Sequence, residues 1–483
     1  KRGMNSLLPK HAFAYLLSHG IPAIVGFVGI AIYSRLLTPE EYGYYAFIFA
    51  SAAIVNAVLF EWLKVSVLRI QKQQELGSSY FMTIKLAFLS LMLISALFGL
   101  VITLIAAGAT PAVVFTILLL AWSQSWYQLH LSLLRSELNP LGYGKVAFAR
   151  SVIGLLSATI LIYFDFGATG LVIGFIIGLL LSVFPMSIRR FGLNMTPSAC
   201  NISLVKQFAS YGLPLTITLL LGIVIHQSDR FIITAMLGME ATGSYAIAYD
   251  LTEQTIFTCM LIINLAAFPL AIRAFEQKGE RAAHQQIKRN TEMLLAVGLP
   301  ATIGFIMTKD FITSFFLGTA FQETARILMP YIAIGAFLKG IKLYAIDTVF
   351  HLTKQTKRQI IPVIFAAVVN VALTIILIPP YGLEGAAIAT VLAYAIAITV
   401  SWLLLVIQRI PYFFPFKEFV KVLLASATMI VSILPFYDES GIVMFLTRVF
   451  IGIFSYSLVY AALHYHQLKA FIENRSERKK RIC

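Results

Sequence analysis

Charged side chains occur inside long apolar segments of this 483-residue chain, and they are the residues best placed to do chemistry. A charged group at membrane depth is costly, so it usually faces a partner or a water-filled cavity. Cations there suit an anionic ligand, while acids suit coupling or gating. The candidate binding cations are Arg35, Arg150, Arg230, Lys339 and Lys342, and the candidate coupling or gating acids are Glu61, Asp229, Asp250, Glu253 and Asp347.

Two of these charged pairs lie on consecutive apolar segments. Asp229 and Arg230 lie about six residues before one segment ends, and Asp250 and Glu253 lie at a similar depth in the next. At about 1.5 Å of rise per residue, both pairs are roughly 10 Å deep. A short turn joins the segments, so Arg230 can pair with Asp250 or Glu253. The pair either locks two helices together or presents Arg230 to a ligand, and both readings stay open.

Lys339 and Lys342 are three residues apart and therefore share a helix face. Two lysines on one face suit a phosphate-bearing ligand as point charges. The alternative is that they pair with Asp347 and with acids on neighbouring helices.

Three further candidates lie towards helix ends. Glu61 and Lys64 are also three residues apart, and they favour a local pair near the membrane interface. Arg35 and Arg150 are either lipid-headgroup anchors or cavity groups.

The sequence contains no pattern that indicates an enzyme, a cofactor site or a metal site. The three cysteines are far apart, and no cluster has metal-ligand spacing. No Ser-His-Asp order or glycine-rich phosphate loop is evident. No loop between apolar segments exceeds about 20 residues, which leaves no room for an extramembrane catalytic domain. We therefore expect a protein that is not an enzyme and needs no cofactor.

The elements that carry these residues are membrane helices. The chain is 59% hydrophobic and only 12% charged, about half the charge of a soluble domain. The apolar blocks are long enough, at about 20 residues each, to cross a bilayer. We count about fourteen, at residues 12–37, 43–67, 81–107, 111–134, 146–164, 169–188, 212–236, 243–272, 290–308, 326–351, 359–378, 384–407, 418–436 and 441–465.

The net charge of +15 indicates membrane topology and not a nucleic-acid partner. With the N-terminus inside, roughly 30 of the 37 Lys and Arg fall on the cytoplasmic side, as the positive-inside rule requires. The outer loops are acidic or neutral. A miscount by one segment would reverse every later loop, so the pattern supports fourteen segments and two cytoplasmic termini.

The chain also repeats itself. Residues 37–46 read LTPEEYGYYA and residues 237–246 read LGMEATGSYA, with five of the ten positions identical. Repeated halves are common in transporters, with the substrate site between them. We predict an all-α membrane protein of two six-helix lobes related by a pseudo-two-fold axis along the membrane normal. The predicted boundaries are 1–195 for the first lobe, 196–411 for the second, and 412–483 for two extra helices and a basic cytoplasmic tail.

Four strings resemble one family in the expected order. They are LLTPEEYGYYAF, RSELNPLGYGKVAFARS at 135–151, DRFII at 229–233 followed by MLGMEATGSYAIAY, and NVALTIILIPPYGLEGAAIAT at 370–390. Together they resemble the polysaccharide (O-antigen, Wzx-type) flippases of the multidrug/oligosaccharidyl-lipid/polysaccharide (MOP) exporter superfamily, and they cover both halves.

The resemblance implies a multi-pass protein of the bacterial inner membrane. Such a protein moves undecaprenyl-pyrophosphate-linked oligosaccharides from the inner to the outer leaflet by alternating access, for O-antigen, lipopolysaccharide or exopolysaccharide synthesis. The implied partners are that glycolipid, membrane lipid, and polysaccharide polymerase and chain-length proteins. We expect a monomer with no nucleic-acid partner.

Two other kinds of protein compete with this reading. One is another branch of the superfamily, either a lipid II flippase, which fourteen segments favour, or an ion-coupled drug antiporter. Against the antiporter, the first segment carries no acid between Ala12 and Leu37. The other is a membrane polymerase or ligase, which would need a long outer loop for its catalytic groups.

Overall fold

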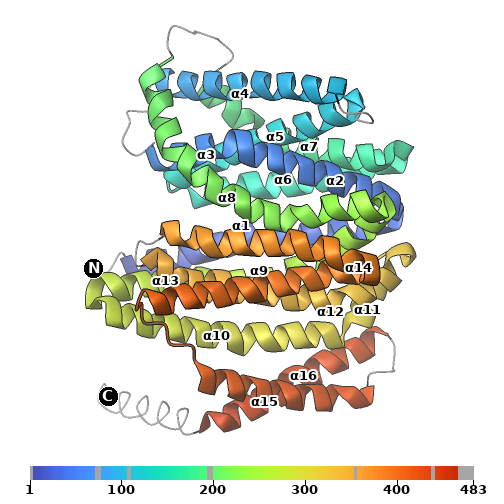
Figure 1. The fold of residues 1–483 in the computed structure, drawn as a ribbon, viewed down its shortest axis with the longest axis vertical. Coiled ribbons are helices and arrows are strands. Elements are labelled where there is room, and N and C mark those ends of the chain that lie inside the picture. The colour runs from blue at the N-terminus through green and yellow to red at the C-terminus, as the bar shows by residue number, and fades with distance from the viewer. Residues whose placement is uncertain are drawn as a thin grey trace. The chain divides into compact units, whose positions relative to one another are not determined.

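The computed structural model describes residues 4–70, 78–105, 110–192, 200–352, 356–436 and 441–465. Within these ranges the chain is helical apart from short turns and contains no strand (Figure 1). The predicted all-α class is therefore confirmed. Residues 466–483, which include most of the predicted basic tail, lie outside the described ranges.

The helices follow one another with short connections. The first part of the chain forms α1 (Met4–Leu36), α2 (Pro39–Val55), η1 (Asn56–Phe60), α3 (Glu61–Ile70), α4 (Ser78–Ile105), α5 (Pro111–Ser136), α6 (Pro140–Leu161), η3 (Ile162–Phe166), α7 (Gly167–Phe191) and α8 (Ile202–Leu237). The remainder forms α9 (Met239–Lys278), α10 (Glu280–Met307), α11 (Lys309–Phe316), α12 (Thr319–Ile341), η5 (Lys342–Ile346), α13 (Asp347–Leu352), η6 (Thr356–Gln359), α14 (Ile360–Ile407), α15 (Phe416–Ile433), η7 (Leu434–Phe436) and α16 (Ile442–Leu463).

Eleven helical spans among the described residues are long and apolar enough to cross a membrane, and residues 20–36 form a shorter apolar helix. Two of the eleven, 140–191 and 360–407, each contain a break in the helical backbone, at Asp165 and at Gly382. Counting both arms of these two spans together with residues 20–36, the structure agrees with the fourteen predicted segments.

The break between α6 and α7 is a tight reversal. Asp165 and Gly167 both have positive φ, at 63° and 50°, which glycine adopts without strain. After the reversal α7 packs directly on α6. The two backbones are so close that a Cβ on Gly174 would lie 2.3 Å from the Cα of Ala158. Only a residue without a side chain allows the two helices to approach this closely.

The repeated decapeptide marks a close crossing of two helices. Thr38 caps α2 with a capping box to Glu41, so the helix begins directly after the turn. A Cβ on Gly43 would lie 1.8 Å from the carbonyl oxygen of Met239, and a Cβ on Gly243 would lie 1.8 Å from that of Pro39. The two repeat copies therefore contact each other symmetrically, and this contact gives a physical reason for glycine at both positions.

The helices group into two compact units. The first contains residues 1–251, 316–325 and 363–389, and its described core includes Phe60, Leu63, Phe88 and Phe208 from η1, α3, α4 and α8. The predicted lobe boundaries at 195 and 411 follow the sequence repeat and stay a prediction.

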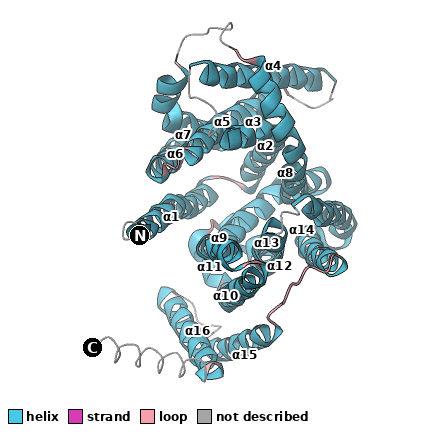
Figure 2. Ribbon diagram, turned by 90° about the vertical axis from the view of Figure 1, so that its left-hand side faces the viewer, coloured by secondary structure: helices cyan, strands magenta, loops and turns pink. Residues whose placement is uncertain are grey.

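The second unit contains residues 252–315, 326–362 and 390–483. In it the two helices predicted as an addition, α15 and α16, pack against each other, and α15 packs along α10 (Figure 2). The buried face of α15 carries Val422, Ala425, Met429 and Ile433, which recur every three to four residues.

Candidate functional site

Arg230 forms a buried ion pair in the first unit. It lies in α8, and the turn at Gly238 returns the chain directly into α9. Arg230 Nη2 is 2.6 Å from Asp250 Oδ1, and only 7% of the Arg230 side chain is exposed. The Tyr42 hydroxyl of α2 donates to the other carboxylate oxygen of Asp250 at 3.3 Å. Of the two acids considered for Arg230, the structure selects Asp250.

Asp229, the neighbour of Arg230, is buried among hydroxyl groups. The Tyr245 hydroxyl donates to Asp229 Oδ2 at 3.1 Å, and the Thr374 hydroxyl of α14 donates to Oδ1 at 3.2 Å. Next to it, Ser228 donates to Asn370 Oδ1 at 3.0 Å. These contacts join α8, α9 and α14 within the first unit around one carboxylate.

Lys339 pairs with Glu253 in the second unit, joining α12 to α9. The Lys339 ammonium also lies 4.6 Å from the centre of the Phe257 ring, a cation–π contact. Phe257 in turn stacks on Tyr344, with ring centres 5.4 Å apart. Lys339 is thus neutralised by a carboxylate and shielded by an aromatic pair.

Lys342 pairs with a different acid, Asp347, at 2.6 Å. Their side chains are only 4% and 5% exposed. The π-helical segment η5 begins at Lys342, and such segments often mark functional positions. Because Lys339 and Lys342 bind separate carboxylates, the structure agrees with the alternative in which both lysines are paired. Their role as substrate ligands stays a prediction.

Glu61 and Lys64 form the predicted local pair, 2.5 Å apart, directly after the π segment η1. Lys64 also donates to the side-chain carbonyl of Gln128 in α5. Lys64 is buried, and the pair is tied to a second helix, which the spacing alone did not indicate.

The remaining two cations differ from each other. Arg35 lies in the last turn of α1 and donates to the carbonyl oxygens of Ala31 and Phe316, at 2.7 and 2.8 Å, so it ties two chain segments together. Arg150 lies near the middle of α6, away from its ends, and its guanidinium carbon is 5.6 Å from the centre of the Tyr127 ring.

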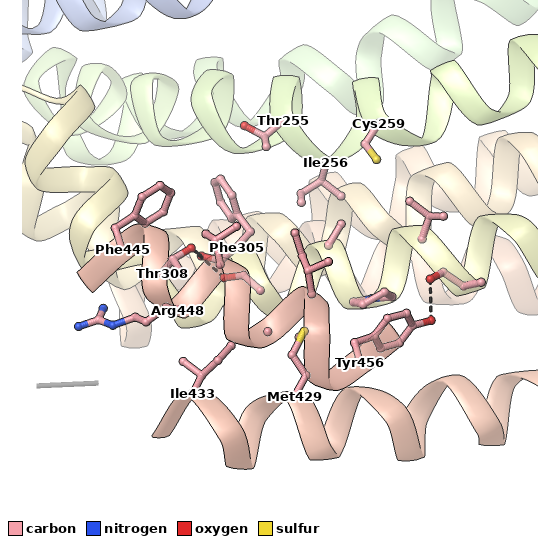
Figure 3. Close-up of a pocket in the computed structure, with 18 residues that line it drawn as sticks. Thr255, Ile256, Cys259, Phe305, Thr308, Met429, Ile433, Phe445, Arg448 and Tyr456 are labelled. Carbon is pink, nitrogen blue, oxygen red and sulfur yellow. Dashed lines mark hydrogen bonds between the residues drawn. The ribbon is translucent and has the colours of Figure 1, made fainter. Parts of the chain in front are cut away.

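An apolar cavity of about 520 Å³ lies in the second unit between α9, α10, α15 and α16. Its walls include Ile256, Phe305, Met429 and Ile433 (Figure 3). Arg448 lines the cavity too and donates to the Phe436 carbonyl oxygen at 2.7 Å. The two C-terminal helices therefore form part of a hydrophobic chamber.

Sequence reasoning missed the hydroxyl and amide side chains that lie around these charges. Tyr42, Gln128, Thr374 and Asn370 carry no charge, so the search for charged residues in apolar segments passed over them. One signal was present, because Tyr245 is an identical position of the repeat and its hydroxyl contacts Asp229.

Comparison with known proteins also indicates a membrane transporter. A family model described as polysaccharide biosynthesis protein matches residues 32–326, more than half of the chain. The lipid II flippase MurJ of Thermosipho africanus (strain TCF52B) is 29% identical over 177 residues, which are 35% of this chain and 35% of that protein. The matched part is thus about a third of that relative's length.

Two solved structures share the fold. One is the lipid II flippase MurJ in an inward closed conformation, with a TM-score of 0.75 and 18% identity, covering 94% of this chain and 99% of that one. The other is an inward-facing multidrug transporter of the MATE family of the MOP superfamily, with a TM-score of 0.60 and 14% identity, covering 82% and 98%.

The chain therefore has the fold of the MOP-superfamily transporters. It belongs to the polysaccharide biosynthesis protein family. These relatives are described as flippases and transporters and not as enzymes, in agreement with the expectation of a non-enzymatic protein. The resemblance in the sequence is confirmed at the level of the superfamily, and the O-antigen type stays a prediction.

Proposed function

We propose that this protein is a flippase that moves undecaprenyl-pyrophosphate-linked oligosaccharide units from the cytoplasmic to the outer leaflet of the bacterial inner membrane. The observation that carries the proposal is the set of arginines and lysines held inside membrane-crossing helices of a polysaccharide biosynthesis protein. Cations at membrane depth usually serve function. The ligand that suits them is a phosphate-bearing headgroup.

Transport would proceed by alternating access. In the predicted topology the turns before α2 and α9 lie on the outer side, where Gly43 and Gly243 bring the two helices into contact. Separation of this crossing would open the outer side. Because the contact is made by backbone and not by long side chains, it can open without breaking an ion pair.

The headgroup would be recognised by exchange of counterions. Among the described residues, Glu253 is the acid that pairs with Lys339. A pyrophosphate that approached Lys339 could displace this carboxylate. Displacement would release Glu253 from α12 and loosen the link between α9 and α12. Substrate binding would in this way be coupled to helix movement.

The apolar cavity beside α15 and α16 is proposed to receive the polyprenyl tail. Its walls are mainly hydrocarbon side chains, which suit an isoprenoid chain. A polar change of similar size in its wall, Met429→Gln, should weaken binding of undecaprenyl pyrophosphate while leaving binding of inorganic pyrophosphate unchanged. Unchanged binding of the lipid would contradict the tail site.

Asp229 is proposed as the coupling carboxylate. Its hydroxyl donors fix the carboxylate oxygens between three helices, so a change in its charge would alter the contact of α8 with α14. Asp229→Asn keeps the size of the side chain and removes its charge. It should preserve headgroup binding and abolish the dependence of transport on an ion gradient, as measured in liposomes with imposed proton or sodium gradients.

The main alternative is a lipid II flippase, which the match to MurJ favours. The two are separated by reconstituting the full chain in liposomes and offering undecaprenyl-pyrophosphate oligosaccharide and lipid II separately. Flipping is measured as loss of headgroup from the leaflet accessible to a membrane-impermeant reagent. Movement of lipid II alone supports the alternative, and uptake of a cationic drug without lipid movement supports the antiporter.

The remaining expectations concern assembly. A monomeric state, two cytoplasmic termini, and polysaccharide polymerase and chain-length proteins as partners all belong to this proposal. Crosslinking in cells that express the surrounding pathway would test the partners.

A further inference from the structure

Four polar side chains of the first unit gather around the middle of α6. They come from four helices, and we call them the Arg150 cluster: Tyr33 of α1, Tyr45 of α2, Tyr127 of α5 and Arg150 of α6. The Arg150 guanidinium lies over Tyr127, and both Tyr33 and Tyr45 lie within electrostatic range of it. The cluster is therefore built from parts of the chain that are far apart in sequence.

The rings are held in place by packing. Tyr45 stacks on Phe175 of α7, with ring centres 5.7 Å apart and planes 17° apart. Tyr33 meets the same Phe175 ring edge-on at 6.2 Å. The exposed fractions of Tyr33, Tyr45 and Tyr127 are 5%, 9% and 6%. Their positions are fixed by the hydrocarbon part of each ring, which leaves the hydroxyls available for another role.

The polar ends of the cluster make few polar contacts with the described residues, although Tyr45 lies within electrostatic range of Asp250 and Arg230 as well as of Arg150. Among the described residues, Arg150 makes no ion pair, and the hydroxyls of Tyr33, Tyr45 and Tyr127 make no hydrogen bond. Buried polar groups normally find partners within the protein, so three buried tyrosines beside a half-buried arginine without an ion pair among the described residues point to a ligand.

The chemistry of that ligand follows from the donors. A guanidinium offers a planar fork of N–H groups that matches two oxygens of a phosphate or a carboxylate. Tyrosine hydroxyls donate to further oxygens of the same group. A neutral sugar or a cation would leave the positive charge of Arg150 uncompensated.

We propose that the Arg150 cluster is an oxyanion site for the transported substrate, taking either the phosphate oxygens of the headgroup or the carboxylate of an acidic sugar. This inference rests on the proposed function, because it assigns a part of the same substrate to a defined place. It adds three uncharged residues to the candidate site and separates Arg150 from the cations that pair with acids.

The test measures lipid binding to the full-length protein by native mass spectrometry. The probes are undecaprenyl pyrophosphate and the same lipid carrying either a neutral disaccharide or one with a glucuronic acid. The variants are Arg150→Gln and the triple tyrosine-to-phenylalanine change at 33, 45 and 127. Lys145→Gln, an exposed cation of the same helix, and Tyr163→Phe, an exposed tyrosine, are the matched controls.

Arg150→Gln should weaken binding at least about tenfold, and the triple tyrosine change several-fold, because each removes donors to a charged oxygen. The two controls should bind as the wild type does. An equal loss with all three probes assigns the site to the phosphate oxygens. A loss confined to the glucuronic acid lipid assigns it to the sugar carboxylate. If Arg150→Gln does not fold, Arg150→Lys replaces it, with a smaller loss expected because charge remains and the fork does not.

Two negative results have different meanings. If the wild type binds the lipids and both site variants bind them equally well, the oxyanion site is wrong and the proposed function stands. If the wild type binds none of the three lipids, the proposed function fails and the site fails with it.

Discussion

Arg150 in the first unit and Lys342 in the second are both cations inside membrane-crossing helices, yet their surroundings differ in whether a carboxylate neutralises the charge. Lys342 has its own counterion, Asp347, five residues along the same chain segment. Arg150 has three tyrosines near it and forms no ion pair with any described acid. A cation with a built-in carboxylate is satisfied without a ligand, whereas a cation among hydroxyl donors is satisfied only by an anion from outside.

The comparison separates cations that hold the fold from cations that await a substrate. Arg230 and Lys339 lie between the two extremes, because each has an acid partner that is more exposed than Asp347. The effect of removing each cation on stability should therefore follow how deeply the cation itself is buried, because water reaches the vacated position less easily where the cation was enclosed; the side chains of Lys342, Arg230 and Lys339 are 4%, 7% and 15% exposed. Removing half of a buried pair leaves an uncompensated charge, while removing a cation without a partner leaves none.

The largest expected effect is that of Lys342→Ala. It would leave Asp347 buried with no cation, and Asp347 Oδ1 already lacks a hydrogen-bond partner among the described residues. We expect a loss of about 3–5 kcal/mol in the free energy of unfolding, measured by titration with denaturing detergent. The double variant Lys342→Met with Asp347→Leu is the control and should recover most of the loss. A stable Lys342→Ala protein would remove one side of the comparison.

The sequence predicted the fold more completely than it predicted which side chains of the candidate site contact each other. Fourteen apolar blocks, the positive-inside pattern and the repeat all reflect the physics of the bilayer, which acts on every residue of a segment. Depth alone predicted that Arg230 pairs with Asp250 or Glu253, and the structure was needed to choose Asp250. The pairing of Lys339 with Glu253 did not follow from depth, because it depends on how α12 packs against α9. The π segment η5 changes the helical register between Lys342 and Asp347, so spacing on an ideal helix could not show which of the two lysines pairs with Asp347.

Arg230→Ala should have the next largest effect, about 3 kcal/mol, because Asp250 is 29% exposed and retains the Tyr42 hydroxyl as a donor. Exchange of the two charges, Arg230→Asp with Asp250→Arg, distinguishes a lock from a ligand. Recovery of both folding and transport indicates a lock, and recovery of folding alone indicates that Arg230 contacts the substrate. A folded and active Arg230→Ala protein would argue against both roles.

Lys339→Ala should cost less, about 2 kcal/mol, which is typical of a lost hydrogen bond to a charged group. Its partner Glu253 is 13% exposed and can gain some solvation. Transport should fall much more than stability if the headgroup displaces Glu253. Lys339→Arg, which keeps the charge, should retain partial transport. Full transport by Lys339→Ala would show that this lysine is structural or redundant.

Arg150→Ala should have the smallest effect on stability, within about 0.5 kcal/mol of the wild type. The change removes the contact over Tyr127, but it also removes a charge that no described acid compensates, and these two contributions oppose each other. Thermal unfolding of the purified protein without substrate provides the measurement, with Lys145→Ala as the exposed control on α6. If Arg150 binds the phosphate oxygens, addition of undecaprenyl pyrophosphate should then raise the melting temperature of the wild type more than that of Arg150→Ala. A loss of stability as large as that of Lys342→Ala would mean that Arg150 holds the fold together, and the distinction between the two regions would fail.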